Sequence, residues 1–362
     1  MIAVLRNMRY AAMALLLVAA YSCSEKEDPE PEIDPDEYAL VTLSNPAPEN
    51  KSFQKIAYFP YYREMDMWSI PDETLKTIDV ACFAFAMIQK YNVAIVEEPG
   101  KLMSLVRRCH ELGVKVLISL SGDSATFRTV TEKKSTRDEY VKSIMNIVSQ
   151  YDLDGVDNDW EFPSTANTSA RGNLNLMREL SNQLHSKGKL LTMAITPGKY
   201  EGNYSNGILT EVFNCVDWFN VMVYDDYSTD VPGINHSTFS LMETAYNYWV
   251  VKRGLPKYKF VGGLPCYGRA SGMTQSGTSM GFASILQQGG DPDSDEAVVS
   301  TSTFPSYTIY YNGRPTIRKK VSYCIEKGVG GYFFWEAGQD IHDDRSLMKA
   351  AYDEAFSLGA VE

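Results

Sequence analysis

The sequence predicts a single α/β domain, a (β/α)8 barrel in which eight parallel strands alternate with helices. Three observations support this fold class. Short apolar segments of strand length recur eight times, segments with the period of an α-helix separate them, and glycines follow several of the helical segments. The chain has 362 residues, 44% of them hydrophobic. It is therefore long enough for one such barrel, which typically needs about 250 residues, together with terminal extensions.

Residues 1–22 have the pattern of a signal peptide. Arg6 and Arg9 precede a short apolar run from Ala11 to Ala20, and Cys23 follows shortly after that run. Cys23 resembles the lipidation site of a bacterial lipoprotein. We therefore expect an outer-membrane lipoprotein that is anchored to the membrane through Cys23 and exposed at the cell surface. The alternative is an ordinary secretory signal with an incidental cysteine.

Residues 23–52 are predicted to form an extended linker. The stretch from Glu25 to Glu37 contains eight acidic residues and one lysine, and prolines recur through the segment. Low hydrophobicity with high charge cannot offset the entropy cost of ordering, and proline and like-charge repulsion keep such a segment extended. We therefore expect the folded domain to span residues 53–362 and to be held off a membrane.

The eight predicted strands are short runs of mostly apolar residues, as expected for parallel strands that are buried on both faces. They cover Lys55–Tyr61, Asp79–Met87, Val114–Ser119, the acidic stretch from Asp154, Leu190–Thr196, Trp218–Tyr224, Lys259–Leu264 and Gly330–Trp335.

The predicted helices carry apolar residues at helical spacing, and Gly113, Gly188 and Gly328 mark the ends of three of them. They cover Pro71–Ile78, Lys101–Leu112, Arg137–Gln150, Asn173–His185, Ser237–Lys252, Thr316–Glu326 and Ser346–Ser357.

The fourth predicted strand carries an unusual group of acids. Alternation along a strand places Asp157, Asp159 and Glu161 on one face, with neighbours about 6.6 Å apart. Like charges this close cannot all ionise, so at least one acid stays protonated near neutral pH and can protonate a leaving group. The alternatives are a solvated acidic loop or a calcium site, although the glycine and the final glutamate of a calcium loop are missing here.

The stretch from Asp154 to Glu161 resembles the signature D-G-x-D-x-D-x-E of glycoside hydrolase family 18, the chitinases and endo-β-N-acetylglucosaminidases. Other predicted strand ends resemble the same family. They are Tyr58, Ser119–Gly122 for S-x-G-G, Met222–Asp225 for M-x-Y-D, Gly263–Arg269 for G-x-P-x-Y-G-R, and Trp335. Ser121 departs from the family glycine. Asn158 departs from an apolar residue, would face the helix layer, and would need a hydrogen-bond partner there.

The resemblance implies hydrolysis of a β-1,4 bond next to an N-acetylglucosamine, with the acetamido oxygen of the substrate as nucleophile and retained configuration. Glu161 would be the general acid and then the general base, while Asp159 would orient the acetamido group. Asp157 would share a proton with Asp159, and Tyr224 would donate a hydrogen bond to the acetamido oxygen. No metal or cofactor is implied.

The resemblance also implies residues that bind the substrate. Trp335 would form the floor of the cleavage subsite, because the apolar face of a sugar stacks on an aromatic ring, and Asp225 would bind the same sugar. The remaining residues of this set are Tyr58, Ser119, Met222 and Arg269. Ser119 would hydrogen-bond the first aspartate of the signature. Arg269 could instead be a structural cation near the acids, and Tyr58 a packed tyrosine.

Residues 270–305, after the seventh predicted strand, are rich in Gly, Ser and Thr and are predicted to form a long loop. Many family members carry a larger α+β subdomain at this place. The segment is too short for a full chitin-insertion subdomain, so we expect an open cleft that favours endo cleavage of accessible oligosaccharides.

Composition restricts the partners. The net charge of −12 makes nucleic acid an unexpected partner, and we expect a monomer that binds oligo- or polysaccharides containing N-acetylglucosamine. The cysteines other than Cys23 are odd in number and widely spaced, which favours buried free thiols over disulfides or a zinc site. They are Cys82, Cys109, Cys215, Cys266 and Cys324. No role is assigned to His236.

Three functions stay open. The first is chitinase-type hydrolysis of N-acetylglucosamine polymers or oligomers, which is favoured by Trp160–Pro163 because this run resembles the W-E-Y-P of chitinases. The second is an endo-β-N-acetylglucosaminidase that cuts the core of N-glycans. The third is a non-catalytic glycan-binding relative, although such proteins usually lack the catalytic glutamate that Glu161 supplies here.

Overall fold

The structure is a computed structural model that describes residues 35–361 except 64–69, 90–91 and 274–277. The predicted signal peptide and Cys23 lie outside the described residues. The folded unit that contains the barrel runs from Asp36 to Glu362, and it is preceded by a separate unit, Met1–Pro35. Among the described residues, no helix has the length and hydrophobicity required to cross a bilayer.

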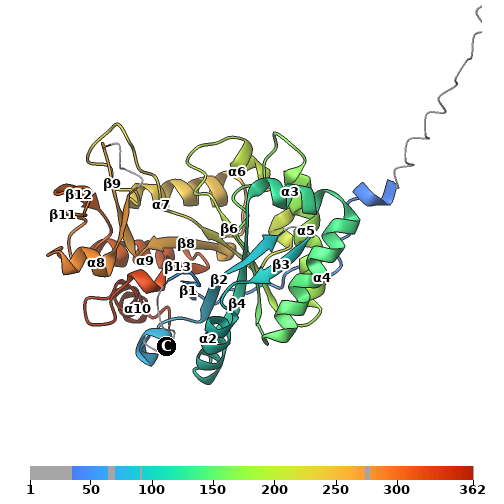
Figure 1. Ribbon diagram of the computed structural model, residues 1–362, viewed down its shortest axis with the longest axis horizontal. Helices are drawn as coiled ribbons and strands as arrows, with labels where there is room; N and C mark the ends of the chain where they lie inside the picture. The colour runs from blue at the N-terminus through green and yellow to red at the C-terminus, as the bar shows by residue number, and fades with distance from the viewer. Residues whose placement is uncertain (1–34, 64–69, 90–91, 274–277, 362) are drawn as a thin grey trace, which may run out of the picture. The chain divides into compact units, whose positions relative to one another are not determined.

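Eight parallel strands close into a barrel, which confirms the predicted fold class (Figure 1). Each strand pairs with the next along the chain, and β1 pairs with both β2 and the last strand, β13. The barrel strands are β1 (Gln54–Pro60), β2 (Val80–Gln89), β4 (Lys115–Ser121), β5 (Gly155–Asn158), β6 (Leu190–Ile195), β7 (Trp218–Val221), β8 (Phe260–Pro265) and β13 (Gly331–Trp335). A short strand that was not predicted, β3 (Val93–Val96), runs antiparallel to β2.

Apolar side chains fill the barrel and the space between strands and helices. Ile56, Val80, Leu117, Val261 and Phe333 belong to the cluster inside the barrel, and a larger buried cluster joins the outer strand faces to the helices. This division explains why the strands read as continuous apolar runs, since both faces of each strand are covered.

The predicted helices are present, with small changes at their ends. They are α1 (Asp72–Leu75), α2 (Pro99–Glu111), α4 (Lys134–Gln150), α5 (Ser169–His185), α7 (Phe239–Tyr246), which continues as a π-helix (Asn247–Lys252), α9 (Arg314–Lys327) and α10 (Leu347–Ser357). Three helices were not predicted, namely α3 (Ser124–Glu132), α6 (Asn203–Gly207) and, after the seventh barrel strand, α8 (Phe282–Gln287). Short 3₁₀ turns cover Pro35–Tyr38, Thr210–Asn214, Lys257–Lys259 and Ala337–Gln339.

The segment after the seventh barrel strand folds, so the prediction of a loop over residues 270–305 is wrong. Four short antiparallel strands form a second sheet in the order β10-β9-β12-β11. The elements are β9 (Tyr267–Ala270), β10 (Ser279–Gly281), α8 (Phe282–Gln287), β11 (Glu296–Val299) and β12 (Tyr307–Tyr310). In Figure 1 this unit lies on the opposite side of the barrel from α4 and α5. An open cleft beside it stays a prediction.

Part of the predicted linker is docked on the barrel, so the expected domain start at residue 53 is too late. The side chain of Asn175 on α5 binds the backbone of Ala39 and Val41, and that of Asn182 binds the backbone of Thr42 and Ser44, with N···O distances of 2.7–3.1 Å. Side-chain amides thus supply hydrogen bonds to an extended segment outside both sheets.

Candidate active site

The sequence-predicted residues meet in a cavity of about 180 Å³ at the carboxyl ends of the barrel strands. The lining consists of Tyr58, Asp159, Glu161, Ala194, Met222, Tyr224, Asp225, Phe333 and Trp335. Hollows of about 510 and 640 Å³ lie elsewhere on the described surface. The acidic residues that line the hollow of about 510 Å³ are exposed to solvent. The hollow of about 640 Å³ lies at the amino ends of β1, β2 and β4. We assign the site to the smaller cavity because buried carboxylates converge there and because chemistry in this fold occurs at carboxyl strand ends.

Asp157 lies at the base of the site and is held by four side chains from four different strands. Its Oδ2 accepts hydrogen bonds from the hydroxyls of Tyr58 (2.8 Å) and Ser119 (2.7 Å). Its Oδ1 accepts from Thr192 Oγ1 (2.5 Å) and Asn220 Nδ2 (3.2 Å). Burial raises the pKa of Asp157, while these four hydrogen bonds act in the opposite direction. Four donors are the surroundings that a carboxylate requires.

Thr192 and Asn220 were not predicted as site residues. Each is an inward-facing polar residue in an otherwise apolar barrel strand, and each is fully buried. A polar side chain inside a barrel needs a partner, so this pattern could have identified both from the sequence.

The three acids do not share one strand as predicted, because β5 ends at Asn158. Asp159 continues the edge of the strand through a hydrogen bond from its N–H to Leu120 O (2.9 Å), and Glu161 follows in the loop beyond. Asp159 and Glu161 nevertheless line the same cavity, above the buried Asp157. Asn158 points away into the helix layer as predicted, and its Nδ2 donates to Asn173 Oδ1 (3.3 Å).

Asp159 has a strongly perturbed carboxyl group. It is only 6% exposed, and its Oδ1 has no hydrogen-bond partner within the described part of the chain. Burial, and then repulsion from Glu161 and Asp157, raises the pKa of Asp159 well above its usual range. The pKa of Glu161 is raised by desolvation and then by Asp225, although this side chain stands at the solvent-exposed rim, where water screens both effects. The two acids titrate as a pair, and one of them carries a proton near neutral pH.

Aromatic rings form the wall of the cavity. Trp335 lies between Tyr58 (centroids 5.4 Å apart) and Phe85 (5.9 Å apart, stacked), and it remains partly exposed. Tyr224 packs edge-on against Phe333, and burial raises the pKa of its hydroxyl well above the usual value. The Tyr224 hydroxyl therefore stays protonated and can donate a hydrogen bond at any ordinary pH, and Trp335 presents a ring on which a sugar can stack.

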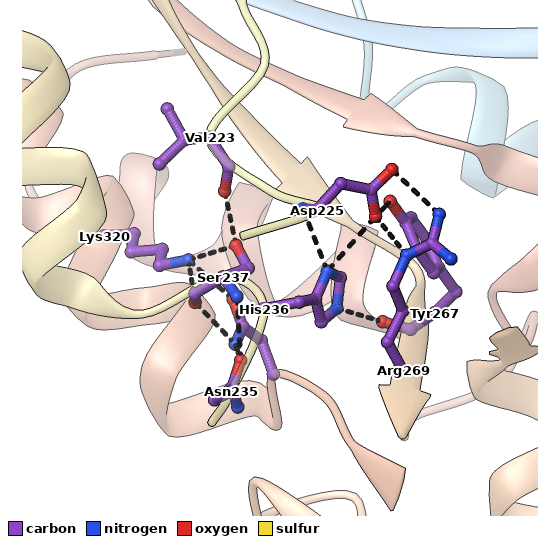
Figure 2. Close-up of polar contacts among 9 residues, drawn as sticks. Val223, Asp225, Asn235, His236, Ser237, Tyr267, Arg269 and Lys320 are labelled. Atoms are coloured by element: carbon purple, nitrogen blue, oxygen red, sulfur yellow. Dashed lines mark hydrogen bonds and ion pairs between the residues drawn. The ribbon is translucent and has the colours of Figure 1, made fainter. Parts of the chain in front are cut away.

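Asp225 differs from the other acids because it is held ionised (Figure 2). It accepts hydrogen bonds from the Tyr267 hydroxyl (2.6 Å) and from Nε and Nη2 of Arg269, the latter at 2.9 Å. Burial alone would raise the pKa of Asp225, but hydrogen bonds from its neighbours outweigh that effect and hold the pKa well below its usual range. Arg269 is thus placed as the partner of Asp225. The cavity thus combines an ionised acid, Asp225, with the pair Asp159 and Glu161, one of which retains a proton, and acid–base chemistry needs this separation.

Two residues contribute in ways the sequence did not indicate. His236 is fully buried, and its Nδ1 lies 3.2 Å from the backbone nitrogen of Asp225. It therefore contacts a site residue, although no role was predicted for it. Trp160 is also fully buried, stacks on Phe127 (5.0 Å) and donates to Ser124 Oγ (2.9 Å). Its side chain therefore packs in the protein core behind the site.

Within the described ranges, no three His, Cys, Asp or Glu side chains are grouped so that they could bind a metal ion. The five described cysteines are buried and unpaired, as predicted.

Comparisons with known proteins agree with this geometry. The sequence profile described as Glycosyl hydrolases family 18 matches residues 54–340. The chain is 30% identical over 281 residues to a class V chitinase of Medicago truncatula, covering 66% of this chain and 72% of the relative. Among solved structures, a GH18 chitinase from the chitin utilization locus of Flavobacterium johnsoniae superposes with a TM-score of 0.72 at 26% identity, over 85% of this chain and 96% of the other.

A third similar protein shows the shared fold. The Cycas revoluta GH18 chitinase, crystallised with allosamidin, superposes with a TM-score of 0.68 at 23% identity, over 83% of this chain and 99% of that chain. The family profile covers most of the barrel, and the acids of the signature converge at its carboxyl face. This chain therefore belongs to glycosyl hydrolase family 18 and is a chitinase-like glycoside hydrolase.

Proposed function

We propose that this protein hydrolyses β-1,4 bonds next to N-acetylglucosamine in chitin or chitooligosaccharides, by a retaining mechanism in which the substrate's acetamido oxygen is the nucleophile. The observation that carries the proposal is the state of Asp159. This buried side chain has a carboxyl oxygen that no described residue hydrogen-bonds, and it lies between the acids Asp157 and Glu161, so it is suited to bind the acetamido N–H of a sugar in the cavity.

The proposed first step transfers the proton of Glu161 to the glycosidic oxygen as the bond to C1 breaks. The acetamido carbonyl oxygen attacks C1 from the other side and closes a five-membered oxazolinium ring. Asp159 accepts a hydrogen bond from the acetamido nitrogen and stabilises the positive charge that develops there. Tyr224, a neutral donor, hydrogen-bonds the acetamido oxygen and aligns it for attack.

The proposed second step returns the catalyst to its first state. Ionised Glu161 takes a proton from water, the hydroxide oxygen attacks C1 on the face that the leaving group vacated, and the ring opens. Configuration at C1 is therefore retained. Asp157, fixed by four donors, lies beside Asp159 and raises the pKa of that neighbour through charge repulsion, which the positive charge on the acetamido group then offsets.

The substrate class rests on the aromatic wall and on the relatives. Trp335 offers a partly exposed ring beside the acids, suited to the apolar face of a sugar. The Flavobacterium relative comes from a chitin utilization locus and the Medicago relative is a class V chitinase, which favours chitin over an N-glycan core. A non-catalytic lectin is disfavoured because Glu161 lines the cavity with a raised pKa.

The location of the protein is a separate proposal from the sequence. Cys23 follows a signal-peptide pattern, so we propose an outer-membrane lipoprotein that acts at the cell surface. Metabolic labelling with a fatty-acid analogue tests this, because Cys23→Ser should lose the label and release the protein from the membrane fraction.

Mass spectrometry of products tests the substrate. Chitotetraose and an N-glycoprotein are incubated with the enzyme in parallel. The proposal expects shorter N-acetylglucosamine oligomers from the former and an intact glycan on the latter. Release of the N-glycan, with chitotetraose left intact, would instead identify an endo-β-N-acetylglucosaminidase.

A further inference from the structure

The turn that carries Tyr224 and Asp225 lies beyond the end of β7 at Val221, so β-sheet pairing does not hold it. Asp225 has a left-handed backbone conformation with φ of 63°, which is unfavourable for a residue with a side chain. Both side chains nevertheless line the cavity. Contacts from outside the barrel must therefore fix this turn.

Residues 235–237, which we call the brace segment, contact the turn on both sides (Figure 2). The N–H of Asp225 donates to Nδ1 of His236 (3.2 Å), and the N–H of Asp226 donates to the His236 carbonyl (3.0 Å). Ser237 Oγ donates to the carbonyl of Val223 (2.5 Å). The brace segment thus holds the backbone immediately before Tyr224 and at Asp225.

The contact with Asp225 fixes the state of His236. A backbone N–H can only donate, so Nδ1 of His236 presents its lone pair to the Asp225 N–H; the same nitrogen lies farther, 3.5 Å, from Asp225 Oδ1. The neutral ring then carries its proton on Nε2, which lies 3.1 Å from the carbonyl oxygen of Tyr267. Burial lowers the pKa of His236, in agreement with the neutral form. Since Tyr267 also donates to the Asp225 carboxylate, His236 connects both ends of that aspartate.

Lys320, on α9, holds the brace segment from the helix layer. Its Nζ donates to the Ser237 carbonyl (2.6 Å), to Ser237 Oγ (2.8 Å) and to Asn312 Oδ1 (2.7 Å). The side chain is fully buried, and all three of these acceptors are neutral oxygens. Burial lowers the pKa of Lys320 to about 7, so the ammonium form with three donors prevails below that pH and the neutral amine with two donors above it. In either form the amino group connects the brace segment to Asn312 and α9.

We propose that Lys320 and His236 are positioning residues for hydrolysis. Lys320 acts through Ser237 to fix the carbonyl before Tyr224, and His236 fixes the backbone of Asp225, so that the Tyr224 hydroxyl and the Asp225 carboxylate keep their places around the sugar. This inference rests on the proposed function for the role of those two side chains. Neither Lys320 nor His236 lines the cavity, so neither is required to touch the substrate.

A matched lysine allows the role of Lys320 to be separated from folding. Lys259 is also buried, at the amino end of β8, and its Nζ donates to the carbonyls of Phe213 and Val216, both at 2.8 Å. Lys320→Met and Lys259→Met each remove a buried amino group and leave backbone oxygens without that donor. Only the former acts on the turn at the cavity.

Steady-state kinetics on a chromogenic chitooligosaccharide, at a temperature where both variants are folded by circular dichroism, test the proposal. Lys320→Met should lower kcat roughly 10- to 100-fold with a smaller change in KM, because the sugar still binds while the groups around the acetamido are misplaced. Lys259→Met should stay within about twofold of wild type. Equal kcat values for the two variants would overturn the role of Lys320.

A pair of conservative variants tests His236. The side-chain oxygen of Asn can replace Nδ1 as acceptor for the Asp225 N–H, whereas the longer side chain of Gln places its amide where Nε2 lies. His236→Asn should therefore retain more kcat than His236→Gln. Equal loss in both variants would show that the ring only fills space.

A crystal structure of Lys320→Met provides a readout that needs no substrate. The proposal expects the Ser237–Val223 bond to break and Asp225 to leave its left-handed conformation, while Lys259→Met keeps both. An enzyme that hydrolyses no N-acetylglucosamine oligomer would contradict the proposed function, and an unchanged turn in Lys320→Met would contradict this inference alone.

Discussion

The hydroxyl of Tyr58 donates a 2.8 Å hydrogen bond to Oδ2 of Asp157 at the base of the active site. It also accepts a hydrogen bond from Asn220 Nδ2 (2.8 Å), so the phenol connects two side chains that are far apart in the sequence. The Tyr58 hydroxyl thus supports an acid while its ring lines the cavity, and contact with the substrate stays a prediction.

Tyr58→Phe should therefore lower kcat on a chitooligosaccharide by about tenfold, because Asp157 loses one of its donors and becomes easier to protonate. Tyr332→Phe is the matched control. Tyr332 is equally buried, in the neighbouring strand, and its hydroxyl has no hydrogen-bond partner in the described part of the chain. A similar loss of kcat in both variants would contradict the support role of the Tyr58 hydroxyl.

Asp159→Asn should reduce hydrolysis by roughly 10²- to 10⁴-fold on substrates that retain the acetamido group at the cleaved sugar. On a chitosan oligomer without that group, wild type and variant should be equally slow, since Asp159 then has nothing to orient. The ratio of the two rates measures this. Asp154→Asn, at the other end of the acidic stretch, is the control, because Asp154 holds the backbone N–H of Val116 (2.7 Å) outside the cavity.

Arg269→Gln should move the acid limb of the pH–rate profile to higher pH. Hydrogen bonds from its neighbours, Arg269 among them, hold the pKa of Asp225 below its usual range, so this carboxylate stays charged in mild acid. Without the guanidinium the pKa rises, and the charged form is lost at a higher pH. Arg314→Gln removes a comparable two-point contact to Asp293, distant from the cavity, and should leave the profile unchanged. An unmoved acid limb in Arg269→Gln would show that Asp225 does not depend on this arginine.

Lys320 should also make the free energy of unfolding depend on pH. Burial lowers the pKa of Lys320 to about 7, although the negative charge of Asp295 acts in the opposite direction. Between about pH 7 and 10 the unfolded chain binds a proton at Lys320 that the folded chain does not. Folding therefore becomes more favourable as pH rises through this window.

Denaturant titrations at several pH values measure that contribution. The slope of unfolding free energy against pH should be higher in wild type than in Lys320→Met, by at most about 1.4 kcal/mol per pH unit. Equal slopes would indicate that Lys320 titrates normally in the folded protein.

Most of the barrel could be predicted from the sequence because each barrel strand is buried on both faces and therefore appears as a run of apolar residues. The catalytic acids could be predicted because charged residues at the end of such a run have no evident structural role. Elements whose apolar residues do not recur at a regular spacing could not be predicted. Six of the nine residues of helix α3 are polar, and the strands from β9 to β12 are only three or four residues long in a segment rich in Gly and Ser.

The remaining gaps concern residues whose roles depend on distant partners. His236 lies in a segment without regular secondary structure and contacts the backbone of Asp225. Such a contact requires no particular pattern of residues, so the sequence does not reveal it. Asn175 and Asn182 look like exposed helix residues, yet they bind the segment that was predicted to be a free linker. Such contacts emerge only when the chain is folded.

The most direct test of the central claim is the turnover of Glu161→Gln on chitotetraose. If Glu161 is the general acid, kcat should fall by roughly 10²- to 10⁴-fold or more, while calorimetry still detects binding of the oligosaccharide. Turnover at the wild-type rate would show that another group donates the proton, and would contradict the assignment on which the mechanism depends.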